Sequence, residues 1–163
     1  MKLRHAAQVL TLTALLAACG SSEATVEDPP DCRHALDRPP PAPVADDVRV
    51  GEAWIAGLRW SQRQPWRERW IPEEGYAAYK AHAIVPAGGT LRLSVPPEAR
   101  SLIRLDYGKL ADTATLSACH GQYAAVPITG ALWVRRPLCR VPLDWRYGDA
   151  RGRLSLTFGR ACD

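Results

Sequence analysis

The feature that most restricts the fold of this chain is an alternation of apolar and polar residues with a period of two. It recurs along residues 44–163 and is clearest at the end, where apolar residues take every second position of 139–147 and of 154–158. No apolar pattern with helical spacing persists there for three turns. Alternation of this kind is typical of strands that bury one face, so it predicts an all-β domain.

Proline and glycine turns divide the alternating region into short strands. Clear runs cover residues 79–85, 91–95 and 103–107, and further candidates cover 48–60, 113–120 and 128–135. About eight short strands with few helix signals predict an antiparallel β-sandwich, and a small β-barrel is the alternative. Residues 44–163 have a usual length for a single domain.

The last two strands predict a hairpin whose turn covers residues 148–152. The register that points both apolar faces the same way sets three pairs opposite each other: Tyr147 and Leu154, Trp145 and Leu156, and Leu143 and Phe158. The same register sets Cys139 opposite Cys162. The alternative is that the C-terminal tail leaves the hairpin before Cys162.

The N-terminus has the layout of a secretory signal. Lys2 and Arg4 precede an apolar run over residues 6–16, and small residues lead up to Cys19. The run is shorter than the roughly 20 residues needed to cross a bilayer, so a transmembrane span is not expected. One possibility is an ordinary secretory signal that is cleaved nearby and leaves Cys19 as an unmodified thiol.

Residues 16–19, Leu-Ala-Ala-Cys, resemble the lipobox of bacterial lipoproteins. The resemblance implies cleavage after residue 18 and acylation of Cys19 with palmitate-type chains, and two such chains hold a protein stably on a membrane. It places the domain outside the cytoplasm, on the cell membrane. In Gram-negative lipoproteins, an Asp directly after the lipidated cysteine resembles a signal for retention in the inner membrane. This chain has Gly20 at that position, so in a Gram-negative cell the outer membrane is the expected destination.

Between the lipobox and the domain lies a segment that is rich in proline and poor in large apolar residues. Residues 20–43 include six prolines. Such a segment cannot bury enough apolar surface to offset the ordering of its backbone, so residues 19–43 are expected to form a disordered tether. The predicted organisation is therefore a signal peptide over 1–18, a lipidated tether over 19–43 and one domain over 44–163.

Four cysteines remain once Cys19 is assigned to lipid. An even number in an exported chain predicts two disulfides, with three possible connectivities. The hairpin register favours Cys139 with Cys162, which leaves Cys32 with Cys119 and would hold part of the tether on the domain. None of the spacings is CxxC and none completes a zinc pattern, so no metal is expected.

Three short motifs in the domain resemble small uncharacterised lipoproteins of high-GC bacteria. They are Ser94-Val95-Pro96, Leu105-Asp106-Tyr107-Gly108 and Phe158-Gly159. The resemblance carries no activity, and the residues themselves indicate none. There is no Gly-x-Ser-x-Gly or His-Glu-x-x-His motif, and a pair of acids at 73–74 is a weak signal. We therefore expect no catalytic residues and no cofactor.

Two histidines of the domain are candidates for acid–base chemistry and are judged unsuited to it. His82 falls on the polar face of a predicted strand, where it is expected to be solvated. His120 follows Cys119 directly, and a disulfide at Cys119 would exclude a Cys-His nucleophile.

A segment rich in tryptophan and arginine, residues 60–70, is the one candidate binding surface in the sequence. Tryptophan and arginine are enriched at interaction hot spots and stack on sugars or cations. The candidate binding residues are Trp66, Arg67, Arg69 and Trp70. The favoured alternative has Trp54 and Trp60 in the core, with Trp66 and Trp70 covering one end of the sandwich under Arg63, Arg67 and Arg69.

These features favour a membrane-anchored binding or structural module of the cell envelope without catalysis. An envelope hydrolase or accessory enzyme, and an inhibitor or immunity-type lipoprotein, are the alternatives. The expected partners are the bilayer and an envelope protein or glycan. Removal of the signal leaves 19 Lys+Arg against 17 Asp+Glu, a net charge of +2, which argues against nucleic acid.

Overall fold

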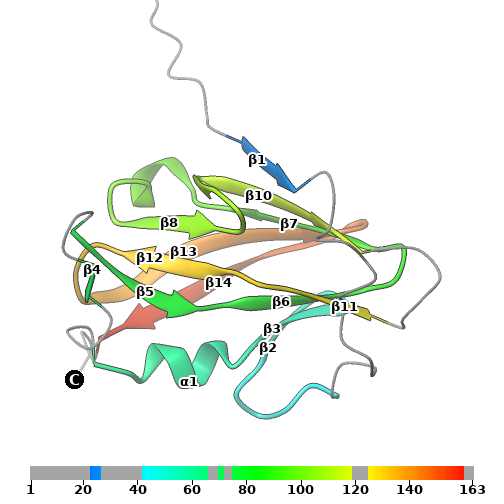
Figure 1. Cartoon of the computed structure of the whole chain (residues 1–163), viewed down its shortest axis with the longest axis horizontal. Coiled ribbons are helices and arrows are strands. Elements are labelled where there is room, and N and C mark those ends of the chain that lie inside the picture. The colour runs from blue at the N-terminus through cyan, green and yellow to red at the C-terminus, as the bar shows by residue number, and fades with distance from the viewer. Residues whose placement is uncertain (1–22, 27–41, 66–69, 72–74, 119–124, 160–163) are drawn as a thin grey trace, which may run out of the picture.

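The computed structural model of the 163-residue chain describes residues 23–26, 42–65, 70–71, 75–118 and 125–159. These residues fold into a mostly antiparallel all-β sandwich, as predicted (Figure 1). The elements are β1 (Glu23–Val26), β2 (Val48–Val50), β3 (Ala53–Ala56), α1 (Leu58–Gln62), β4 (Trp70–Ile71), β5 (Tyr76–Lys80), β6 (His82–Pro86), β7 (Thr90–Ser94), the 3-10 helix η3 (Pro97–Ala99), β8 (Ile103–Asp106), β9 (Leu110–Ala111), β10 (Thr113–Ser117), β11 (Ala125–Ile128), β12 (Ala131–Val134), β13 (Leu138–Tyr147) and β14 (Ala150–Phe158).

The described strands form three sheets around one hydrophobic core. The first sheet has the order β1-β10-β7-β13-β14, the second β11-β6-β3-β2 and the third β4-β5-β12-β8-β9. In Figure 1 the long β13–β14 hairpin runs behind β5, β6 and β12. Contacts of β10 with β6 and β8, and of β13 with β2, join the two layers. Each of these sheets ends in edge strands, so the alternative of a closed barrel is wrong.

The predicted strand over residues 79–85 is one continuous segment that passes from the third sheet to the second. Its strands β5 and β6 are separated only by Ala81, and they pair with β12 and β11 in one uninterrupted register. At the crossing point the Ala81 N–H donates to the Gly130 carbonyl over 2.9 Å. The predicted face is buried along its whole length: Tyr79, Ala81, Ala83 and Val85.

Tyr107 fixes this bend from inside the core. Its ring is 2% exposed, and its hydroxyl donates to the Ala81 carbonyl over 2.5 Å. A Cβ added to Gly130 would lie 2.1 Å from the nearest ring atom of Tyr107, closer than real Cβ atoms come. Glycine is therefore required at the crossing point because the aromatic ring occupies the space of a side chain.

The segment over 48–60 differs from the single strand that the sequence predicts. It forms the β2–β3 hairpin and then α1. Gly57 has φ +63°, which turns the chain out of β3, and its N–H donates to the Asp47 carboxylate over 2.7 Å. In the helix Leu58 and Ser61 are buried, and the Ser61 hydroxyl donates to the Lys80 carbonyl. A glycine in the left-handed region thus changes a strand into a helix that an alternation pattern does not show.

The β13–β14 hairpin exists, but its register differs from the predicted one by four positions. The structure sets Tyr147 opposite Ala150, and three further facing pairs are Trp145 and Gly152, Leu143 and Leu154, and Val141 and Leu156. The turn therefore consists of Gly148 and Asp149, with φ +55° at Gly148. Two-residue turns with glycine first match the twist of a hairpin better than a five-residue turn does. Because the shift is even, the apolar residues still share one face.

This register removes the geometric reason for pairing Cys139 with Cys162. A bulge between Leu138 and Val141 shifts the pairing again, and Arg140 within it has φ +57°. Leu138 then faces Phe158. Cys139 lies in this bulge, and the cysteines at 32, 119 and 162 lie outside the described residues, so the two disulfides stay a prediction.

A strand also forms within the predicted disordered tether. Residues Glu23–Val26 make β1, which adds to the edge of the first sheet in a parallel pairing with β10. Glu23 takes the position beside Thr113, and Thr25 the position beside Thr115. The exposed hydrogen-bonding edge of β10 explains the pairing, because an unpaired strand edge accepts any extended segment within reach. The prediction of a disordered tether is therefore wrong for these four residues.

Candidate functional site

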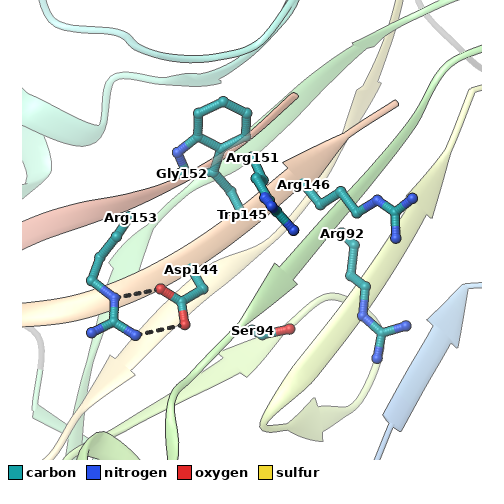
Figure 2. A pocket seen from close by; sticks show the side chains of 8 residues that line it. All are labelled: Arg92, Ser94, Asp144, Trp145, Arg146, Arg151, Gly152 and Arg153. Carbon is teal, nitrogen blue, oxygen red and sulfur yellow. Dashed lines mark hydrogen bonds and ion pairs between the residues drawn. The ribbon is translucent and has the colours of Figure 1, made fainter. Parts of the chain in front are cut away.

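Three arginines form a row across adjacent strands on the outer face of the first sheet. Arg92 on β7 faces Arg146 on β13, and Arg146 faces Arg151 on β14. We call Arg92, Arg146 and Arg151 the arginine row. All three are exposed, and Figure 2 shows them on the same side of the sheet.

The local sequence explains why these side chains meet. On β7 the neighbours of Arg92, Leu91 and Leu93, are fully buried, so the alternation directs Arg92 outward. The Arg146 Nε donates to the Gly148 carbonyl over 3.1 Å, within the turn that sets the register of the hairpin. The same two-residue turn places Arg151 in β14 opposite Arg146.

Like charges on facing strands destabilise a sheet, because the side chains lie only about 5 Å apart at their bases. Arginine stays protonated at any physiological pH, so the row cannot lower its charge by titration. In register, the same row continues from Arg92 to Thr115 on β10 and to Thr25 on β1. An arrangement that costs stability and carries fixed positive charge is typical of a surface that binds anions.

A carboxylate in the neighbouring row, Asp144, is engaged by a fourth arginine. Asp144 accepts two hydrogen bonds from Arg153, over 2.6 Å from Nε and 2.9 Å from Nη2. These hydrogen bonds, and then the charge of Asp144, raise the pKa of Arg153. Glu98 lies 3.7 Å from the same guanidinium. The acid in the neighbouring row is therefore neutralised by Arg153, as the dashed lines in Figure 2 show.

The outer face is hollowed beside the arginine row. A shallow cavity of about 550 Å³ is lined by Arg92, Ser94, Asp144, Trp145, Arg146, Arg151, Gly152 and Arg153. A smaller one of about 300 Å³ adjoins it and shares Arg92 and Arg146. Gly152 faces Trp145, and a Cβ there would lie 2.8 Å from the indole. The half-buried Trp145 belongs to the other face of β13, where it packs against the hydrophobic core.

The predicted tryptophan- and arginine-rich surface is only partly described. Trp66, Arg67 and Arg69 lie outside the described residues, and Trp70 begins β4, where it faces Ala77. Their role in binding therefore stays a prediction.

The alternative prediction places Trp54 and Trp60 in the core, and it is wrong for Trp60. Trp60 lies in α1 and is 45% exposed, whereas Trp54 in β3 is half-buried. Buried Leu58 and Ser61 occupy the inward face of α1, so Trp60 falls on the outer one. The Arg63 Nη2 donates to the Asp46 carboxylate over 2.8 Å.

His82 is half-buried, where the sequence predicts a solvated side chain. Its Nδ1 accepts the Gly130 N–H over 3.4 Å at the bend. Burial, and secondly the charge of Lys80, lower the pKa of His82. His120, Cys119 and the acids at 73–74 lie outside the described residues. Among the residues that are described, no group of three His, Cys, Asp or Glu side chains could hold a metal ion.

All three arginines of the row are present in the sequence, but the sequence alone does not indicate that they face one another. Arg92 and Arg146 stand at polar positions of predicted strands, which is the only signal available. The predicted register sets Arg146 opposite Ser155 and leaves Arg151 in a turn, so the third member is lost. The row becomes visible only when the strand order and the two-residue turn are known.

Comparisons with protein-family models, with curated proteins and with solved structures find no match to this chain. No helix within the described part of the chain is long and apolar enough to cross a membrane. The geometry of the first sheet therefore carries the functional argument.

Proposed function

We propose that this chain is a lipid-anchored, extracytoplasmic lipoprotein whose β-sandwich is a non-catalytic binding module of the cell envelope. The observation that carries the binding role is the arginine row, three facing like charges on adjacent strands of one sheet. The observation that supports the anchor is the Leu-Ala-Ala-Cys sequence at residues 16–19. With Gly20 after the lipidated cysteine, a cell with two membranes would carry the protein on the outer one.

Binding fits this face better than hydrolysis does. Guanidinium groups neither give nor take protons near neutral pH, so Arg92, Arg146 and Arg151 cannot act as a general acid or base. The carboxylate beside them, Asp144, is held by Arg153. The groups on this face can attract and orient an anion, which is what a binding module needs.

Two disulfides are part of the same proposal. Export would place Cys32, Cys119, Cys139 and Cys162 in an oxidising compartment, where an even number of cysteines is usually paired. A bond from Cys139 would act at the β13 bulge, where the two strands of the hairpin lose their regular pairing.

The anchor and the binding role are tested separately. In cells fed a tagged fatty acid, we expect the wild-type protein to take up label and the Cys19→Ala variant to take up none. Equal label in both proteins would contradict the lipid anchor. Binding is tested with the mature Cys19→Ala chain, which has no acyl groups.

We expect the mature Cys19→Ala chain to sediment with washed cell envelopes. Replacement of Arg92, Arg146 and Arg151 by Gln should leave it in the supernatant. Envelope binding that survives this triple substitution would show that the arginine row is not the binding surface.

A further inference from the structure

The ligand of the arginine row can be assigned by chemical class, and the assignment rests on the proposed lipid anchor. We propose that the row binds the phosphate groups of the anionic lipid surface on which Cys19 is anchored. Three features of the molecule support this ligand: the arginine content of the face, its shape, and the place of β1 in the same sheet.

The lining of the large hollow is rich in arginine. Among the described residues that line it, four are arginines, Arg92, Arg146, Arg151 and Arg153, and one is an acid, Asp144. The whole chain without its signal has a net charge of only +2. The described part of this face therefore carries more arginines than acids, on a protein that is nearly neutral as a whole. Arginine pairs with phosphate oxygens through two parallel N–H donors, so phosphate is an anion that these side chains suit.

The shape of the face fits a surface rather than a single small molecule. A site for a small ligand buries most of that ligand in a cleft, whereas the side chains of the arginine row are exposed on a shallow face. Neighbouring strands lie about 4.8 Å apart, so the row spreads its charges over about 10 Å. Such spacing can engage several phosphate groups of one layer at the same time.

The place of β1 connects the row to the anchor. Glu23, the first residue of β1, is four positions after Cys19, a distance of at most about 14 Å along an extended chain. Since β1 is the edge strand of the first sheet, Arg92 lies two strands away and Arg151 four, or about 10 and 19 Å. An acylated Cys19 would thus hold this sheet, not the opposite layer, against the membrane.

The experiment measures binding of the mature Cys19→Ala chain to lipid vesicles, so that acyl chains play no part. One set of vesicles contains phosphatidylglycerol in phosphatidylcholine, and the other phosphatidylcholine alone. The test variant carries Arg92→Gln, Arg146→Gln and Arg151→Gln. The matched control carries Arg49→Gln, Lys109→Gln and Arg136→Gln, which remove the same charge from exposed positions outside the first sheet.

We expect the parent chain to bind the anionic vesicles and to ignore the neutral ones. The test variant should lose about a hundredfold in its partition coefficient, at about fivefold per arginine near the surface. The control variant should lose less than about threefold, and binding of the parent should weaken steeply with salt. A thermal melt of each variant shows that the protein measured is folded.

Four results would overturn the inference. Equal losses in the test and control variants would show a response to net charge alone. Undiminished binding of the folded test variant would exclude the row as the contact. Inorganic pyrophosphate that binds at micromolar concentration and displaces the chain from vesicles would make a free phosphate compound the ligand. Envelope binding that persists while pure lipid vesicles fail would leave the proposed binding module standing and reject only the lipid as its ligand.

Discussion

Two regions of the molecule are built from strands with the same alternation of apolar and polar residues. One is the bend between the second and third sheets, and the other is the outer face of the first sheet. At the bend the Tyr107 ring is buried and its hydroxyl bonds the Ala81 carbonyl, with Gly130 leaving space for the ring. On the outer face Arg92, Arg146 and Arg151 are exposed and repel one another. We therefore expect the bend to contribute to stability and the face to cost some stability, which is the usual difference between a structural region and a binding region.

The largest effect should come from Tyr107→Ala. The substitution removes the buried ring and its hydrogen bond to the Ala81 carbonyl, and it leaves a cavity at the bend. We expect the free energy of unfolding, measured by urea titration, to fall by about 3–5 kcal/mol. Tyr107→Phe keeps the ring and loses only the hydroxyl, so its cost should be about 1–2 kcal/mol.

A second substitution sharpens this test. Gly130→Ala places a methyl group into the space of the Tyr107 ring and should destabilise the wild-type protein. In the Tyr107→Ala background the space is free, so the same change should cost much less. Equal costs in both backgrounds would show that the ring and the glycine are not fitted to each other.

A smaller effect at the bend should depend on pH through His82. Its folded pKa is lowered, mainly by burial, so the unfolded chain binds the proton more readily. Stability is therefore fully present above the unfolded pKa of about 6.5 and is lost as the pH falls from there toward the lower folded pKa. Protonation would also remove the acceptor for the Gly130 N–H.

The measurement is the free energy of unfolding at pH 7.5, 6.5 and 5.5 for wild type and His82→Gln. We expect a decline in wild type over this range and a flatter profile in the variant. Parallel profiles would assign the decline to other groups.

The difference between bend and face also explains what the sequence can predict. Parity along a strand is local, so the burial of Tyr79, Ala81, Ala83 and Val85 and the all-β class follow from alternation alone. Register is not local: a two-residue turn at Gly148 instead of a five-residue one moves every facing pair by four positions. The core tolerates that error because the shift is even.

The candidate site does not tolerate the same error, because it is defined by which arginines face each other. Strand order adds a second non-local unknown, since β7 pairs with β13 from a distant part of the chain. The chosen candidate residues, Trp66, Arg67, Arg69 and Trp70, came from composition, which marks unusual segments but not faces formed by several strands. The helix that contains Trp60 is not predicted from the sequence either, because the left-handed conformation of Gly57 redirects the chain.

The smallest effect should have the opposite sign, at the end of the arginine row. Arg151→Thr removes one like-charge pair, that with Arg146, and places a β-branched residue in an exposed strand position. We expect the free energy of unfolding to rise by about 0.2–1 kcal/mol at low salt, and the gain to shrink as salt screens the repulsion. Arg153→Thr is the control on the same strand: it breaks the two hydrogen bonds to Asp144 and should lower stability. If Arg151→Thr destabilises the protein as Arg153→Thr does, the row is a structural element of the sheet, and the contrast between face and bend fails. If it stabilises, the sheet carries a charge arrangement that its own fold does not need, as is expected of a binding face.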